Sequence, residues 1–145
     1  MSEHRKYKLK ILPAKRKNRL EMKEINEKCL PENYDISVWE QFISYHNSFV
    51  LYADSVVVGY CLCGDDGSIA SFAILPGYRG RGYGKNLLSV AIEHLKKKFS
   101  VIFLQVRISN SSAISLYKSV GFVVDSTLSR YYGDGENGYK MIIRK

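Results

Sequence analysis

A chain of 145 residues with an ordinary hydrophobic share of 46% has the size of one domain with one buried core. No apolar run reaches the ~20 residues of a membrane helix, and residues 1–6 lack the apolar stretch of a signal peptide, which argues against membrane and secreted proteins. The formal net charge of +8 favours anionic partners such as a polyphosphate cofactor or ribosomal RNA. We therefore expect one soluble, cytoplasmic domain over residues 1–145.

The first third of the chain predicts one strand followed by two helices. Alternation of apolar and polar residues from Tyr7 to Leu12 indicates a half-buried strand. Apolar residues then recur at helical spacing from Leu20 to Cys29, and Pro31 ends that segment. Asp35 is the expected N-cap of the second helix, in which Trp39 faces the core.

The middle of the chain predicts three antiparallel strands and then a crossover. Two β-rich runs, Phe49 to Ala53 and Val56 to Cys63, form a hairpin, and a turn leads into a third strand from Ser68 to Ile74. A helix with an apolar stripe from Leu87 to Leu95 follows, and the apolar run from Val101 to Val106 fits a strand buried on both faces. Because crossovers are right-handed and parallel, the third strand should lie beside or near this run, with ligands at their carboxyl ends.

The end of the chain predicts a capped helix and a closing hairpin. Asn110 is placed to cap the helix, and Gly121 is placed to end it. The segments Phe122 to Val124 and Tyr139 to Ile143 would then pair across a polar loop that includes Gly133 to Glu136.

The three cysteines and three histidines indicate no metal or redox chemistry. Cys29, Cys61 and Cys63 lack the paired spacing of metal ligands. Alternation places Cys61 and Cys63 on one face of a strand, where neighbours rarely bridge, so we interpret them as small buried side chains in a reducing compartment. The histidines are scattered, and we expect neither a zinc site nor a Cys-His pair for nucleophilic catalysis.

A glycine-rich segment lies between the third strand and the helix after it. Its residues are Arg79, Gly80, Arg81, Gly82, Tyr83, Gly84 and Lys85. Unpaired backbone N–H groups and the positive end of the helix dipole make the start of a helix an anion site. Glycines let a bulky phosphate approach the backbone, while Arg79, Arg81 and Lys85 add charge that matches a diphosphate. The segment therefore predicts a ligand that carries phosphate.

Two nucleotide-binding motifs fail at this segment. A P-loop needs glycine where Arg79 stands, and Ser or Thr where Asn86 stands. A dinucleotide fingerprint needs a third glycine where Lys85 stands. An RNA-binding Arg-Gly segment and a purely structural glycine-rich turn stay open as alternatives.

Two blocks of sequence then resemble one enzyme superfamily. Arg79, Gly82 and Gly84 match Arg/Gln-x-x-Gly-x-Gly/Ala, which is the pyrophosphate loop of the GNAT superfamily of acetyltransferases. The block from Leu104 to Asn110, followed by Ala113-Ile114, Leu116-Tyr117 and Gly121-Phe122, is similar to the RimI and NatA-type N-terminal acetyltransferases.

Two further blocks narrow the resemblance. Leu30 to Tyr34 reads Leu-Pro-Glu-Asn-Tyr, and the stretch from Tyr131 to Met141 carries Tyr-Tyr-x-Asp-Gly-Glu and Tyr-x-Met. Both resemble the catalytic subunit of NatA and its archaeal, Ard1-like counterparts. The four blocks stand in the family's order and cover most of the chain.

The resemblance implies the GNAT fold, a mixed α/β sheet with about seven strands, about four helices and a splayed central strand pair. It implies acetyl-CoA as the cofactor, CoA as the product, and the pyrophosphate on the loop from Arg79 to Lys85. The other residues it places at the cofactor are Phe72, Ala73, Ile74, Asn110, Ala113 and Tyr117, the last beside the thioester sulfur. The residues it implies at the substrate's N-terminus are Leu30, Pro31, Glu32, Tyr34, Tyr131 and Tyr132.

Without a candidate nucleophile, the simplest chemistry is direct attack of a free amine on the thioester in a ternary complex, where positioning supplies much of the gain. Backbone N–H groups at the end of the strand Ser68 to Ile74 would stabilise the oxyanion, and Tyr117 would give a proton to the departing thiolate. RimI-like enzymes carry a glutamate, taken as the general base, where this chain has Gln105, and an amide has no usable basicity. The available carboxylate is Glu32, which we expect to orient the amine or accept its proton through water.

The acidity of the substrate lightens the demand on such a base. An α-amine of pKa ~7.8 is about a tenth neutral at pH 7, whereas a lysine amine of pKa ~10.4 is neutral less than about once in a thousand. We therefore predict a monomeric acetyltransferase of protein N-termini with small first residues such as Ser or Ala, and also Met, with ribosome association as a further expectation. A GNAT enzyme for small-molecule amines or lysines, and a non-catalytic basic module that binds ribosomes or RNA, stay open.

Overall fold

The computed structural model describes residues 6–145, so the segment expected to lack a signal peptide lies almost wholly outside the described residues. Within that part of the chain, seven strands and four α-helices are formed, together with two short 3-10 turns at Arg16–Asn18 and Pro76–Tyr78. In chain order the elements are β1 (Leu9–Pro13), α1 (Arg19–Cys29), α2 (Ile36–Ile43), β2 (Phe49–Ala53), β3 (Val56–Cys63), β4 (Ile69–Ile74), α3 (Tyr83–Lys96), β5 (Val101–Arg107), α4 (Ser111–Ser119), β6 (Val123–Leu128) and β7 (Gly138–Arg144).

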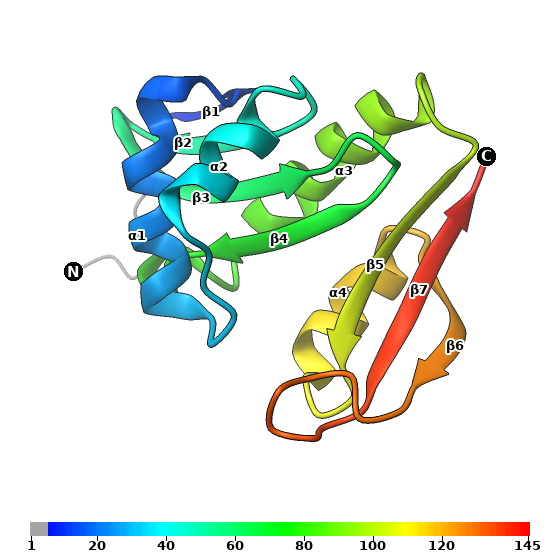
Figure 1. Cartoon of the computed structure of the whole chain (residues 1–145). Helices are drawn as coiled ribbons and strands as arrows, with labels where there is room; N and C mark the ends of the chain where they lie inside the picture. The colour runs from blue at the N-terminus through cyan, green and yellow to red at the C-terminus, as the bar shows by residue number, and fades with distance from the viewer. Residues whose placement is uncertain (1–5) are drawn as a thin grey trace.

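The strands form two antiparallel sheets that meet at one point. The first sheet has the order β1-β2-β3-β4 and the second has the order β5-β7-β6. A single parallel bridge between Ser68 and Phe103 joins them, and Phe103 N donates to the carbonyl oxygen of Gly67 at 3.1 Å. From this bridge, β4 and β5 diverge towards their carboxyl ends, as Figure 1 shows. The expected parallel crossover and splayed pair are thus confirmed.

The helices cover the first sheet on both sides. In Figure 1, α1 and α2 lie in front of β3 and β4, and α3 lies behind them. Trp39 of α2 is fully buried against Tyr60 of β3, with the two rings nearly perpendicular and their centroids 5.2 Å apart. A second core cluster packs α3 against strands of both sheets, and it includes Leu87, Leu88, Leu104 and Met141.

The helix ends form as the sequence indicates. Asp35 caps α2, because its side chain accepts a hydrogen bond from Ser37 N. Asn110 caps α4 in the same way through Ala113 N, at 3.2 Å. Gly121 follows α4 with φ of 110°, a left-handed conformation that glycine adopts without the strain of a Cβ.

One expectation is wrong: β5 is not buried on both faces. Ile102, Leu104 and Val106 are buried, whereas Phe103, Gln105 and Arg107 alternate with them and are only partly buried. The physical reason is the splay, since the helices that cover the first sheet do not extend over β5 on that side. We call the face that carries Phe103, Gln105 and Arg107 the open face of β5.

The cysteines are free thiols within the described residues. Cys61 and Cys63 lie on the same face of β3 with their Sγ atoms 3.8 Å apart, and both are fully buried. Between residues 6 and 145, no group of three or more His, Cys, Asp or Glu side chains could hold a metal ion, and no helix is long and apolar enough to cross a membrane.

Candidate active site

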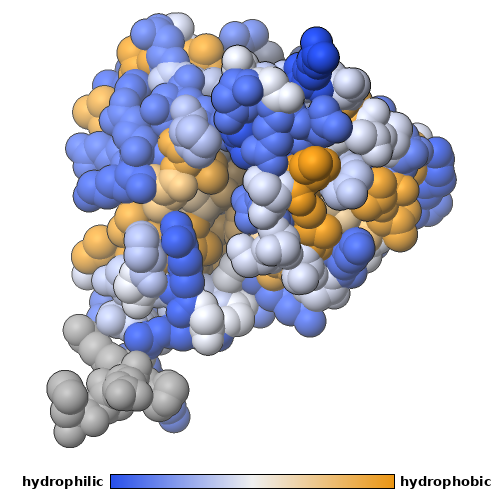
Figure 2. All heavy atoms as spheres, turned by 90° about the horizontal axis from the view of Figure 1, so that it is seen from below, coloured by the Kyte–Doolittle hydropathy of each residue, from blue (hydrophilic) through white to orange (hydrophobic). Residues whose placement is uncertain are grey.

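The two halves of the molecule are separated by a cleft where the strands splay. Figure 2 shows this hollow from below, with apolar surface inside it and hydrophilic side chains along much of its rim. Beyond the Ser68 bridge, β4 pairs with β3 along one edge and has no partner strand along the other. This second edge presents unpaired backbone groups to the cleft. Phe72, Ala73 and Ile74 belong to this part of β4, as expected.

The glycine-rich loop leads into the first turn of α3. Gly82 is the N-cap, with φ of 84°, and no side chain caps the helix there. Gly80 also has a left-handed φ of 76°, and a Cβ on either glycine would meet no atom within 4 Å. The loop therefore leaves space beside a helix start that no side chain caps, which is the arrangement of an anion site.

The basic residues of the loop differ in what they do. Arg79 donates from Nε to the carbonyl oxygen of Ile74 at 2.7 Å, which ties the loop to the end of β4. The Arg81 guanidinium lies 5.5 Å from the ring centroid of Tyr7, while Lys85 is exposed on the first turn of α3. Arg79 thus has a structural contact that the sequence did not indicate.

Gly84 allows close packing at the start of α3. A Cβ there would lie 3.2 Å from Phe72 Cζ and 3.5 Å from Leu116 Cδ2. Its partner Phe72 in turn contacts Tyr117, with ring centroids 6.3 Å apart. We therefore attribute Gly84 to helix packing beside the cleft, in addition to the phosphate role expected of the loop.

Tyr117 of α4 lies against the cleft wall. Its ring packs between Phe72 and Phe122, and 9% of the residue is exposed. Burial raises the pKa of the hydroxyl well above its usual range, so Tyr117 is a neutral O–H donor at physiological pH. Among the described residues, this hydroxyl makes no hydrogen bond.

Arg107, which sequence reasoning missed, joins two loops that are far apart in the chain. Its Nη2 lies 2.6 Å from Glu32 Oε2 in the α1–α2 loop. Its Nη1 lies 2.8 Å from Asp134 Oδ2 and 2.9 Å from Glu136 Oε1 in the β6–β7 loop. The guanidinium also stacks on the Tyr132 ring, 4.3 Å from its centroid. We call this cluster the Arg107 clasp.

The clasp uses one oxygen of Glu32. Both Nε and Nη2 of Arg107 donate to Oε2, and within residues 6–145 no hydrogen bond is made to Oε1. Glu32 is partly exposed, with 38% of its side chain accessible. The carboxylate is therefore held in place by one oxygen and available through the other.

A buried network supports the α1–α2 loop from below. Asn26 donates from Nδ2 to the Tyr60 hydroxyl and to the carbonyl oxygen of Glu32, and its Oδ1 accepts from Asn33. The Tyr60 hydroxyl shares a 2.7 Å hydrogen bond with Ser71 of β4. The loop that holds Glu32 is thus fixed to β3 and β4 through the buried side chains of Asn26, Tyr60 and Ser71.

The tyrosines of both loops line the same region. Tyr34 donates to the carbonyl oxygen of Ala70 at 3.2 Å, and Tyr131 packs edge-on against Tyr132. Burial, and then the charge of Glu32, raise the pKa of Tyr132 to about 12. Of the other expected residues, Leu30 is half-buried and Pro31 is exposed.

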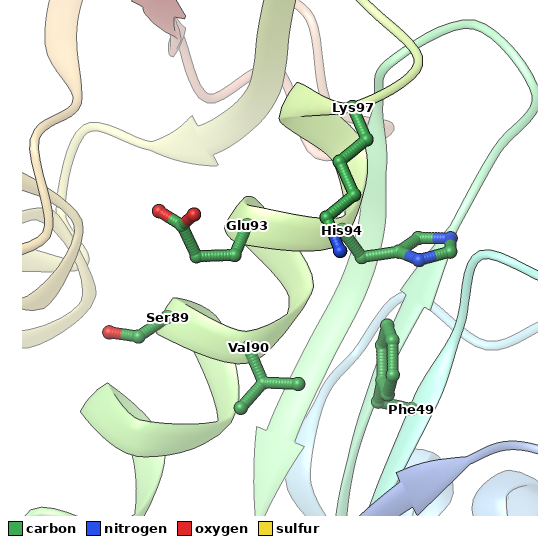
Figure 3. Close-up of a pocket in the computed structure, with 6 residues that line it drawn as sticks. All are labelled: Phe49, Ser89, Val90, Glu93, His94 and Lys97. Carbon is green, nitrogen blue, oxygen red and sulfur yellow. The ribbon is translucent and has the colours of Figure 1, made fainter.

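A second hollow, of about 450 Å³, lies on the outer side of α3 (Figure 3). Its lining residues are Phe49, Ser89, Val90, Glu93, His94 and Lys97. His94 Nε2 lies 2.9 Å from Asn47 Oδ1, which also accepts from Lys98, so these side chains fix the end of α3 to the turn before β2. Burial, and then Lys98, lower the pKa of His94. This hollow is shallow and none of its residues belongs to the cleft.

Comparison with known proteins places this geometry in a family. The acetyltransferase (GNAT) family matches residues 19–122. The chain belongs to the GNAT acetyltransferases. Acetyl-CoA is the acetyl donor of this family.

Individual relatives agree with this placement. An N-alpha-acetyltransferase of Sulfurisphaera tokodaii is 34% identical over 137 aligned positions, and the match covers 81% of this chain and 82% of that protein. A Dictyostelium discoideum homologue of the ARD1 subunit of the N-terminal acetyltransferase complex is 34% identical over 145 aligned positions, and the match covers 92% of this chain and 71% of that protein. Ard1 from Thermoplasma volcanium has the same fold, with a TM-score of 0.87, 24% identity and coverage of 94% and 97%.

Proposed function

We propose that this acetyltransferase acetylates the N-terminal α-amine of proteins, with small first residues such as Ser or Ala, and also Met, as substrates. The observation that carries the proposal is the Arg107 clasp, which brings the Leu30–Tyr34 loop and the Tyr131–Glu136 loop to one end of the cleft. Two tyrosine-bearing loops at one end of the cleft suit an extended peptide end. A binding site for a small amine has no use for them.

Acetyl-CoA supplies the acetyl group as a thioester. The loop from Gly80 to Gly84 and Lys85 would bind its pyrophosphate, with Asn110 and Ala113 at the start of α4 beside it. The free edge of β4 at Phe72, Ala73 and Ile74 would hold the extended part of the cofactor through backbone hydrogen bonds.

The amine nitrogen attacks the acetyl carbon, so that a C–N bond forms and the C–S bond breaks. Glu32 Oε1 orients the amine and takes its proton directly or through water, while Oε2 remains on Arg107. Tyr117 donates to the sulfur as negative charge develops there, and the thiolate finally gains a proton from this hydroxyl or from solvent. Gln105, on the open face of β5, carries an amide and cannot act as the base.

The proposal is tested by incubating the purified protein and acetyl-CoA with peptides that begin Ser, Ala, Met-Leu and Met-Glu. We expect acetylation of the α-amine, located by mass spectrometry. Transfer only to an internal lysine, or only to a small amine, would overturn the assignment. A Glu32→Gln variant with an unchanged rate across pH would remove Glu32 from the mechanism.

Residues 1–145 are also proposed to act as one catalytic domain and as a monomer in the cytoplasm. One core cluster includes side chains from both sheets, which supports a single folding unit. Association with ribosomes is favoured by the net charge of +8, since nascent N-termini emerge beside ribosomal RNA. Sedimentation of the protein with purified ribosomes at low and high salt checks this point.

A further inference from the structure

Lys140 is a positive charge on the substrate side of the cleft that the mechanism does not use. It lies in β7 directly opposite Gln105 of β5 in the antiparallel register. Directly opposite residues of a sheet point to the same face, so Lys140 shares the open face of β5 with Gln105 and Arg107. Its Nζ lies 5.0 Å from the centroid of the Phe103 ring, which confirms that orientation.

Lys140 has no acidic partner in the described chain. The three carboxylates of the Arg107 clasp, Glu32, Asp134 and Glu136, are all bound to Arg107. Asp125 stands at the bulge of the neighbouring strand β6 and forms no ion pair with Lys140. A half-buried ammonium over an aromatic ring is only weakly compensated, so a carboxylate that reaches it gains both charge attraction and hydrogen bonds.

The charges on this side of the cleft are separated in space. Glu32 offers a free carboxylate oxygen where the α-amine is expected. Lys140 lies in β7, which is one strand further from β4 than β5 is. Neighbouring strands are about 4.8 Å apart, and a peptide advances about 3.3 Å per residue, so residues shortly after the N-terminus pass Lys140. A peptide with a positive end and an early acidic side chain matches this arrangement.

We propose that Lys140 determines substrate specificity by binding an acidic side chain at the second or third residue of the protein N-terminus. This inference rests on the proposed function. The preferred substrates are therefore small first residues followed closely by Asp or Glu. This selection is made by charge, and it acts on peptide binding more than on the chemical step.

The test compares Ser-initiated peptides of one length that carry Glu or its neutral isostere Gln at position 2, 3 or 4. For the wild-type protein, kcat/KM should be about fivefold higher for Glu than for Gln at position 2 or 3, mainly through KM. The ratio should approach one in Lys140→Met, stay high in Lys140→Arg and invert in Lys140→Glu. It should shrink in high salt, because the ion pair is partly exposed.

Lys97→Met is the matched control, since Lys97 is an exposed lysine at the C-cap of α3, outside the cleft. It should leave the Glu/Gln ratio unchanged. Acetylation of all peptides with the same ratio in wild type and Lys140→Met would overturn the role of Lys140 alone. If no peptide is acetylated while other amines are, both the proposed function and the role of Lys140 would be overturned.

Discussion

The guanidinium of Arg107 lies 2.6 Å from the carboxylate of Glu32, so a residue at the end of β5 holds the loop between α1 and α2. Replacement Arg107→Gln removes this contact and those to Asp134 and Glu136. Both loops then lose their common anchor, and KM for a Ser-initiated peptide should rise about tenfold or more. KM for acetyl-CoA should stay unchanged, because its proposed loop lies before α3.

Arg16→Gln is the control for the Arg107 variant. Arg16 also pairs with a glutamate, Glu40, at 2.9 Å, but its side chain is 73% exposed and lies away from the cleft. Exposed ion pairs contribute little, so peptide KM should be that of the wild type. Equal effects of the two variants would show that the clasp does not position the loops.

Tyr117→Phe should lower kcat about 100-fold with little effect on stability, because the ring contacts with Phe72 and Phe122 remain and only the donor is lost. Steady-state rates, together with thermal unfolding, separate the two effects. Tyr45→Phe, which removes a hydroxyl from the surface beyond α2, should leave kcat intact. An unchanged kcat in Tyr117→Phe would exclude an acid role.

Gly82→Ala should destabilise the protein by about 1–2 kcal/mol, since it forces a Cβ into a left-handed conformation at φ of 84°. It should also raise KM for acetyl-CoA, because relief of the strain moves the first N–H groups of α3. Gly77→Ala is a matched control: a Cβ there also meets nothing within 4 Å, and no left-handed φ is required. Chemical denaturation and cofactor titration of both variants check the difference.

The clasp should loosen in acid. Hydrogen bonds from Glu136 N, and then from Arg107, hold the pKa of Asp134 below its usual range, and hydrogen bonds from Ser109, and then from Arg107, do the same for the pKa of Glu136. Depressed carboxyl pKa values stabilise the folded state above the unfolded values, and this stabilisation is lost as pH falls through the folded values.

Thermal unfolding from pH 6 down to pH 3 should therefore show a steeper loss below about pH 4.5 in the wild type than in Arg107→Gln. NMR titration of the two carboxyl carbons measures the pKa values directly. Normal values for both groups in the wild type would contradict the arrangement.

Local chemistry in the sequence predicted much of the fold. The runs Phe49–Ala53 and Val56–Cys63 form strands with those bounds, because β-branched and aromatic residues bracket a short turn. The β6 strand extends to Leu128, further than expected from the sequence. Ser126 and Thr127 are polar and exposed, so pairing with β7, and not a local pattern, makes them part of the strand.

The sequence predicts a part of the candidate site where one continuous segment holds all of its residues. The loop from Arg79 to Lys85 is such a segment, because its glycines and basic residues directly precede a helix. Arg107 was not predictable, because its partners come from two loops on either side of it in the chain and meet only in the folded protein. Its partners do belong to recognisable motifs: Glu32 is part of Leu-Pro-Glu-Asn-Tyr, and Asp134 and Glu136 are part of Tyr-Tyr-x-Asp-Gly-Glu. One signal could have identified Arg107: two loops carry three acidic residues, and an arginine at the end of a strand lies between those loops in the chain.

The parting of β4 and β5 beyond the Ser68–Phe103 bridge sets a limit on how this protein can be made more robust. Additional backbone hydrogen bonds between neighbouring strands ordinarily stabilise a sheet, so selection for heat resistance would favour them. Here each added pair of backbone hydrogen bonds would narrow the cleft in which we propose that the two substrates meet. Heat-tolerant variants that keep their turnover should therefore draw their substitutions from the helices and outer strands and leave this seam open.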